Sequence, residues 1–229
     1  MKNYLLIIIL LFVCLGGYTQ QLGQVSFLQA SNFAWFTLIT NQSILIRVSD
    51  DGKILEFGTE QASRNNRNYI AQELLPYQGV VSYYDNKADS AFKGKIKNIG
   101  TCYFTYYPSS DYPDKAGKIK SAGSLFFDYY RNFEDPLTGG KIKNIGYNTI
   151  TYYNSFDNEA VKGKLKSVGT TSIQYYSSYD DPYLKGKLKN IGNYRYDWMK
   201  TFSGKDFYVS LKTGSQRQLI SGVTYIPQY

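Results

Sequence analysis

Hydrophobic and polar positions alternate through residues 81–199, and the whole pattern returns every 23 residues. Each copy contains a Gly-Lys-(Ile/Leu)-Lys string, and a Tyr-Tyr pair precedes that string by 11 residues. Self-similarity at one fixed period is the signature of a repeat protein. The sequence therefore predicts five tandem repeats over residues 81–199. Their strings begin at Gly94, Gly117, Gly140, Gly163 and Gly186, with no insertion between them.

Each repeat is expected to form two short strands joined by turns. The first strand is typified by Lys95–Ile99 and the second by Tyr147–Tyr153 or Thr170–Tyr176. In the second strand, apolar, polar and aromatic positions follow one another in the same phase in every copy, which predicts half-buried strands. The apolar column is Phe104, Phe127, Ile150, Ile173 and Tyr196, and the aromatic column is Tyr106, Tyr129, Tyr152, Tyr175 and Trp198.

The first strand of each repeat has an irregular spacing of apolar residues. Ile96 and Ile99 are three positions apart and cannot share one face of a regular strand, because side chains alternate between the two faces. We expect a bulge or an early turn at the small polar residue Asn98 and the glycine after it. The strand should therefore bend sharply at this point in every copy.

The fold class expected is all-β, with the two-stranded repeats forming an elongated antiparallel meander or rolled sheet. The alternative is a β-solenoid, in which identical residues of successive coils stack ~4.8 Å apart. A solenoid would place the lysines of successive copies side by side, and like charges directly opposite each other destabilise a sheet. In a meander the two strand types alternate, and Asp128 and Asp197 become candidate cross-strand partners for the lysines. We therefore expect the meander.

Tandem two-stranded units of this length, rich in Gly, Tyr and Lys, resemble MORN-type repeats in their bacterial variants. The resemblance covers Val81 to Met199. It lacks the Gly-x-Gly and Tyr-x-Gly elements of that family, and the tyrosine pair lies farther from the Gly-Lys string. The Tyr-Asp repeats of secreted bacterial proteins are a second likeness. Either resemblance implies an elongated β-repeat scaffold that binds proteins or surfaces, and neither implies particular functional residues.

Both flanks are expected to be caps, because a repeat array needs atypical ends to cover its exposed edges. Residues 20–80 form the N-terminal β cap, in which the polar stretch Thr59–Gln72 is a loop or a short helix. Residues 200–229 form the C-terminal capping hairpin. The expected strands are Phe33–Ile39, Ser43–Val48 and Lys53–Phe57 in the first cap, and Phe207–Leu211 paired with Leu219–Tyr225 in the second.

Residues 1–19 have the form of a secretory signal peptide, with a basic start, an apolar run over residues 5–15 and small residues after it. The run is too short for a membrane-spanning helix, which needs ~20 residues. Cleavage is expected after Thr19. It would remove Cys14 and leave Cys102 as the only thiol, so no intrachain disulfide is expected. The predicted location is the periplasm, surface or exterior of a bacterium.

The composition narrows the chemistry further. The 229 residues contain no histidine, which excludes Ser-His and Cys-His catalysis and histidine-ligated zinc. Only a carboxylate pair remains for acid–base catalysis, and repeats multiply residues rather than build one site, so we expect no enzyme. No cofactor is expected. No metal site is expected either, because the acidic turns lack the spacing of a calcium-binding loop.

Two residue types at fixed register are the candidate binding residues. The chain has 26 basic residues (Lys and Arg) and 18 acidic residues (Asp and Glu), which gives a net charge of +8. The lysines of the repeated strings either bind an anionic polymer or form a solvated face of the sheet. The second tyrosine of each pair points away from the first, so it is exposed for stacking or packed on a second layer. The lysines are Lys95, Lys97, Lys118, Lys120, Lys141, Lys143, Lys164, Lys166, Lys187 and Lys189, and the tyrosines are Tyr107, Tyr130, Tyr153 and Tyr176.

We therefore expect a non-catalytic exported repeat protein that acts as a binding or structural module of the bacterial envelope or exterior. Its partner is an unknown envelope protein or an anionic polysaccharide, and nucleic acid is not expected outside the cytoplasm. The alternative is a small outer-membrane β-barrel, although strands of about six residues are shorter than the ~9–11 that spanning requires. Replacing exposed lysines is expected to leave stability nearly unchanged, because exposed charges contribute little.

Overall fold

The computed structural model describes residues 20–60, 74–203 and 206–228. The predicted signal peptide and most of the stretch Thr59–Gln72 lie outside these residues. Every regular element of the described part is a β-strand, which confirms the all-β prediction. This part of the chain accordingly contains no helix with the length and hydropathy to cross a membrane.

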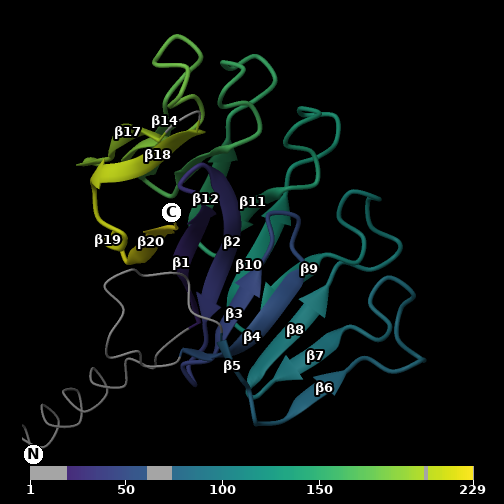
Figure 1. Cartoon of the computed structure of the whole chain (residues 1–229). Coiled ribbons are helices and arrows are strands. Elements are labelled where there is room, and N and C mark those ends of the chain that lie inside the picture. Colours follow the sequence, from purple (N-terminus) through teal and green to yellow (C-terminus); the bar gives the residue numbers. More distant parts are fainter. Residues whose placement is uncertain (1–19, 61–73, 204–205, 229) are drawn as a thin grey trace, which may run out of the picture.

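The repeats form one 11-stranded sheet, in which each strand pairs antiparallel with its neighbour in the chain (Figure 1). This order confirms the meander. Its strands are β6 (Val81–Tyr83), β7 (Ile96–Ile99), β8 (Cys102–Tyr106), β9 (Ile119–Ala122), β10 (Leu125–Tyr129), β11 (Ile142–Ile145), β12 (Asn148–Tyr152), β13 (Leu165–Val168), β14 (Thr171–Tyr175), β15 (Leu188–Ile191) and β16 (Tyr194–Arg195).

Short turns and long loops alternate along this sheet. At one end of the strands, two residues join each hairpin, as between Ile99 and its partner Cys102. The first of the two is Gly100 at φ 56°, a left-handed conformation that glycine adopts without steric cost. At the other end, a long loop joins consecutive hairpins and is closed by the Tyr84 N–H bonding to Lys95 O at 2.9 Å. The two ends of the sheet therefore present different surfaces.

The bulge lies one residue earlier than predicted. Ser82 is opposite Asn98 and Tyr83 is opposite Ile96, so Lys97 is the extra residue, and the later repeats shift at the equivalent lysine. The extra residue restores the parity of the strand, which lets both apolar positions of the string face the core. In the third repeat, both Ile142 and Ile145 are fully buried.

A second sheet of seven strands joins the two ends of the chain. Strand β1 pairs antiparallel with β2 and parallel with β20, so the N-terminal and C-terminal flanks form one unit. The order is β19 (Gln218–Ile220), β20 (Val223–Pro227), β1 (Gln21–Leu28), β2 (Asn32–Ile39), β3 (Leu45–Val48), β4 (Ile54–Glu60) and β5 (Leu74–Pro76).

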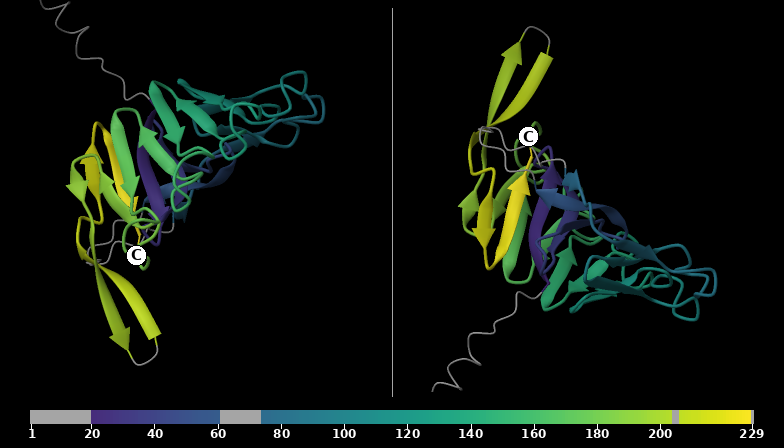
Figure 2. Two further views of the ribbon diagram at one scale, coloured as in Figure 1. Left: turned by 90° about the horizontal axis from the view of Figure 1, so that it is seen from above. Right: turned by 90° about the horizontal axis from the view of Figure 1, so that it is seen from below.

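The seven-stranded sheet covers a face of the repeat sheet (Figures 1 and 2). Buried side chains of both sheets, such as Phe36 and Ile46 from one and Phe104 and Ile150 from the other, belong to a single hydrophobic core. Burial of each such side chain contributes roughly 1.5–3 kcal/mol. Gly52 in the β3–β4 turn lies so close to the Tyr129 hydroxyl that a Cβ there would come within 2.2 Å of it. The flanks were predicted to cover the edges of the array. Within the part of the chain that the structure describes, no flank strand pairs with the edge strands β6 and β16, and the flanks supply the second layer of the core instead.

Of the two predicted C-terminal strands the structure has the first, and the predicted pairing between them is wrong. The first of them lies in β18 (Asp206–Thr213), which pairs with β17 (Asp197–Ser203) in a hairpin that projects from the two sheets (Figure 2). The second, Leu219–Tyr225, is not one strand: a turn at Ser221 and Gly222 divides it between β19 and β20, which pair with each other, and β20 also pairs with β1. The parallel pairing of β20 with β1, which is about 200 residues away, leaves no local pattern in the sequence, and the pairing of the C-terminal strands was therefore predicted wrongly.

Candidate functional site

The first lysine of each string lies half-buried between repeats. Lys141 donates from Nζ to Gly163 O of the next repeat at 2.9 Å, and the same atom lies 4.9 Å from the centre of the Tyr152 ring. Lys95 and Lys118 make the equivalent bonds to the glycine carbonyls of the repeats that follow them. These ammonium groups therefore connect neighbouring repeats rather than face open solvent.

In the last two repeats, the same lysine column bonds to the second sheet. Lys164 Nζ donates to Ser31 O and Asn32 Oδ1, both at 2.8 Å, and Lys187 Nζ donates to Gln29 O at 2.9 Å. These acceptors lie in and beside the β1–β2 turn. Burial lowers the pKa of Lys164 to about 8, and the neighbouring Lys187 ammonium adds to this effect. The column is thus part of the interface between the two layers.

The second lysine of each string, which is the bulge residue, lies over the second tyrosine of the preceding pair. The distances from Nζ to the ring centre range from 5.0 Å at Lys143 to 5.8 Å at Lys97. From the third repeat onward, an acidic residue of the same repeat's long loop forms an ion pair with it, as Glu134 does with Lys143 at 3.2 Å. The predicted cross-strand partners are wrong: Asp128 pairs with Lys115, and Asp197 pairs with Arg195.

The second tyrosine column packs against the following repeat. Tyr130 donates from its hydroxyl to Ile150 O at 2.9 Å, and its ring meets the Tyr152 ring edge-on with centres 6.1 Å apart. Burial raises the pKa of this phenol. The equivalent hydroxyl bonds run from Tyr107 to Phe127 O, from Tyr153 to Ile173 O and from Tyr176 to Tyr196 O. The column is therefore half-buried against the following repeat of the same sheet, which differs from both free exposure and packing on a second layer.

The candidate residues thus form a ladder in which lysines, tyrosine rings and backbone carbonyls alternate from repeat to repeat. We call this set, made of both lysine columns and Tyr107, Tyr130, Tyr153 and Tyr176, the lysine–tyrosine ladder. Most of its polar groups bind backbone carbonyls or acidic side chains of the same protein, which is the chemistry of a structural network.

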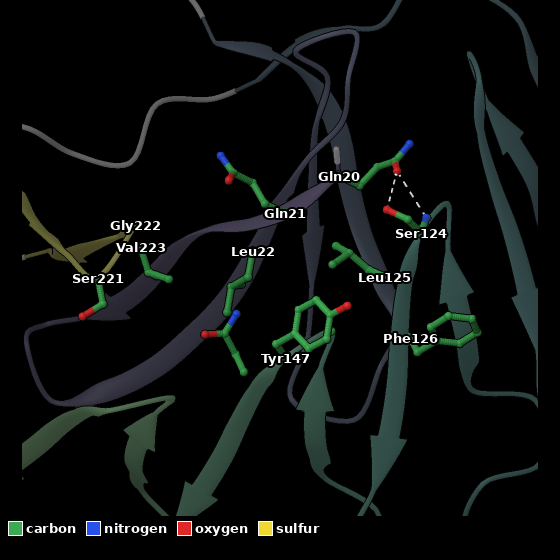
Figure 3. Close-up of a pocket in the computed structure, with 12 residues that line it drawn as sticks. Gln20, Gln21, Leu22, Ser124, Leu125, Phe126, Tyr147, Ser221, Gly222 and Val223 are labelled. Atoms are coloured by element: carbon green, nitrogen blue, oxygen red, sulfur yellow. Dashed lines mark hydrogen bonds between the residues drawn. The ribbon is translucent and has the colours of Figure 1, made fainter. Parts of the chain in front are cut away.

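A pocket of about 450 Å³ lies where the short turns of the repeat sheet meet the ends of β1 and β20 (Figure 3). Phe126 and Tyr147, which line it, are strongly exposed. Gln20 Oε1 accepts from Ser124 N at 3.2 Å and from Ser124 Oγ at 2.9 Å, which links the two sheets at the rim. The other lining residues are Gln21, Leu22, Leu125, Gly146, Asn148, Ser221, Gly222 and Val223.

None of these lining side chains carries a charge at neutral pH. The pocket combines amide and hydroxyl groups with apolar walls and two aromatic rings, a mixture typical of sites that orient a small ligand through a few polar contacts. Sequence reasoning missed this site because its walls come from segments about 100 residues apart. The only local signal is Tyr147, which occupies a turn position that Thr101, Ser124 and Thr170 hold in other repeats.

The acidic side chains and the free thiol are the remaining candidates for chemistry in the described part of the chain. There, His, Cys, Asp and Glu side chains form no group of three or more that could hold a metal ion. The acidic turns bind backbone groups instead, as Asp135 accepts from Ser155 N at 3.0 Å. Cys102 is a buried thiol whose pKa burial raises to about 11, which keeps it protonated and unreactive.

Comparisons of the chain with protein-family models, with curated proteins and with solved structures found no match.

Proposed function

We propose that this chain is an exported, non-catalytic binding module that holds an uncharged, hydroxyl-rich ligand, such as a neutral saccharide, in the pocket between its two sheets. The observation that carries the proposal is the lining of the pocket. Phe126 and Tyr147 offer exposed ring faces, while Gln21, Asn148 and Ser221 offer amide and hydroxyl groups. Rings of this kind stack on the apolar face of a sugar, and the polar groups bond its hydroxyls.

The contacts of the lysine–tyrosine ladder argue against an anionic polymer as the ligand. A polyanion gains affinity by displacing counterions from accessible cations. Here Lys118 and Lys141 already donate to backbone carbonyls, and Lys143, Lys166 and Lys189 form ion pairs. Binding a polymer there would break contacts that join the repeats.

Two further features support the proposal. The signal-like pattern of residues 1–19 supports export. Within the described residues, the strands of both large sheets follow a linear order, and neither sheet closes on itself. Open sheets of this kind fit a binding module. The likeness to MORN-type repeats stays a prediction, and it fits a role in binding.

Titration calorimetry of the purified protein with short neutral oligosaccharides, such as cello- and chito-oligomers, tests the proposal. We expect at least one to bind, and we expect Tyr147→Ala to weaken that binding about threefold to tenfold, since a stacked ring contributes roughly 0.5–1.5 kcal/mol. The matched control is Tyr83→Ala, which removes an exposed tyrosine from the edge strand β6. Absence of binding by every neutral oligosaccharide, or equal loss in the two variants, would overturn the proposal.

A further inference from the structure

A row of exposed aromatic side chains lies at the end of the repeat sheet opposite the pocket. The long loops of three consecutive repeats carry Phe133, Phe156 and Tyr179 at intervals of 23 residues, and these side chains are 80%, 94% and 93% exposed. The same position holds Lys87 and Ser110 in the first two repeats. Clustered exposed apolar side chains mark interaction sites. We call these three residues the loop-tip row.

The backbone beneath the row is held in place by bonds between neighbouring loops. Asp135 accepts from Ser155 N at 3.0 Å and from Ser155 Oγ at 2.7 Å, directly before Phe156. Asn158 accepts from Ser178 N at 2.9 Å, directly before Tyr179. Each repeat adds two strands, so the bases of neighbouring loops lie ~10 Å apart. Loops fixed in this way lose little entropy when a ligand binds them.

The charge around the row restricts the ligand. In each of the three loops, which span residues 131–139, 154–162 and 177–185, carboxylates outnumber basic side chains. Glu134, Asp157 and Asp180 are neutralised by ladder lysines at 3.2, 3.8 and 3.3 Å. With these charges paired, the loops have no surplus of basic side chains that could attract a polyanion or an anionic membrane, so an uncharged partner is favoured.

We propose that the loop-tip row binds a linear, uncharged glycan that crosses the three loops. The apolar faces of its sugar rings would stack on the three aromatic rings. Its hydroxyls would donate to the carboxylate oxygens beside those rings. A glycan with a regular repeat fits the regularly spaced loop-tip row, because each aromatic ring of the row then contacts the same group of the glycan. The site shares no residue with the pocket and does not depend on it.

Affinity electrophoresis of the purified protein in gels that contain soluble neutral polysaccharides (hydroxyethyl cellulose, glycol chitin or xylan) tests the inference. The test variant is Phe133→Ser, Phe156→Ser and Tyr179→Ser together, which installs the residue that the second repeat has at this position. We expect at least one polymer to retard the protein. In the Tyr147→Ala background, which weakens any contribution of the pocket, we expect each single substitution to weaken retardation about threefold to tenfold and the triple substitution to abolish it. Because the three side chains are exposed, thermal melting should be unchanged.

Tyr147→Ala is the matched control, since it removes an exposed ring from the pocket alone. Retardation that survives in this variant and is lost in the triple variant supports the inference, even where no oligosaccharide enters the pocket. Absence of retardation in every neutral polymer overturns it. Binding to phosphatidylglycerol vesicles that the triple variant loses would assign the row to a membrane, and would equally overturn it. Retardation lost only in Tyr147→Ala would support the pocket and refute the row.

Discussion

Replacing Lys141 with methionine is expected to destabilise the fold more than the same replacement at Lys143, two residues away. Methionine keeps most of the aliphatic stem and removes the ammonium group. Lys141 is 23% exposed, donates to Gly163 O at 2.9 Å and forms an ion pair with Asp50 at 3.1 Å. A bond from a charged donor contributes about 1.5–3 kcal/mol and a ring contact about 0.5–1 kcal/mol. We therefore expect Lys141→Met to lower the free energy of unfolding by about 2–4 kcal/mol.

Lys143→Met is the control because its ion pair with Glu134 is more exposed. Such pairs contribute about 0–1 kcal/mol and the contact with the Tyr130 ring adds about 0.5–1 kcal/mol, so a loss of about 0.5–2 kcal/mol is expected. Urea denaturation of the two variants and the parent, followed by tryptophan fluorescence and circular dichroism, measures the difference from the shift in midpoint at constant slope. Losses that agree within about 0.5 kcal/mol would refute the reasoning, because the string lysines would then all be solvated surface charges.

Two further predictions concern the tyrosines and the turn glycines. Burial raises the pKa of Tyr129 and Tyr152 well above 10 and that of Tyr225 to about 12, so the unfolded chain loses these protons first. Stability should be complete below pH 10 and fall as the pH rises through 12; a constant urea midpoint between pH 9 and pH 11.5 would contradict this. Gly169→Ala should cost about 1–2 kcal/mol, because Gly169 has φ 55° and a Cβ would lie 3.0 Å from Asn148 Oδ1. Equal melting temperatures of Gly169→Ala and the parent would show that the turn relaxes instead.

The array could be predicted because its information is local and repeated. The column that contains Phe104 and Ile150 is buried, as the alternation indicates, and so is the aromatic column that contains Tyr129. The fixed positions of the lysines also favour the meander over the solenoid, because a solenoid would place like charges directly opposite each other in neighbouring strands. A period repeated five times makes the phase of each strand unambiguous.

The bulge, the second layer and the pocket could not be located in this way. A bulge at Lys97 and a bulge at Asn98 would change the alternation of side chains along the strand in the same way. Only the pairing with Ser82 and Tyr83 shows that the bulge is at Lys97. The second layer depends on a parallel pair between β1 and β20, which are about 200 residues apart. Because the pocket rim joins Gln20 to Ser124, it exists only once that layer is in place.

The lysine–tyrosine ladder explains why the flanks cover this array as they do. The first lysines of the first three repeats donate to a glycine carbonyl of the next repeat, whereas Lys164 and Lys187 do not, and after Lys187 the array has no next repeat. At the position where a sixth glycine would stand, 23 residues after Gly186, the chain has Val209. The β1–β2 turn supplies the missing acceptor, since Lys187 donates to Gln29 O, while Ala30 O receives the backbone N–H of Leu188 at 2.8 Å. The N-terminal strands thus complete the last repeat, and the pairing of β1 with β20 holds them in the position where that acceptor is required.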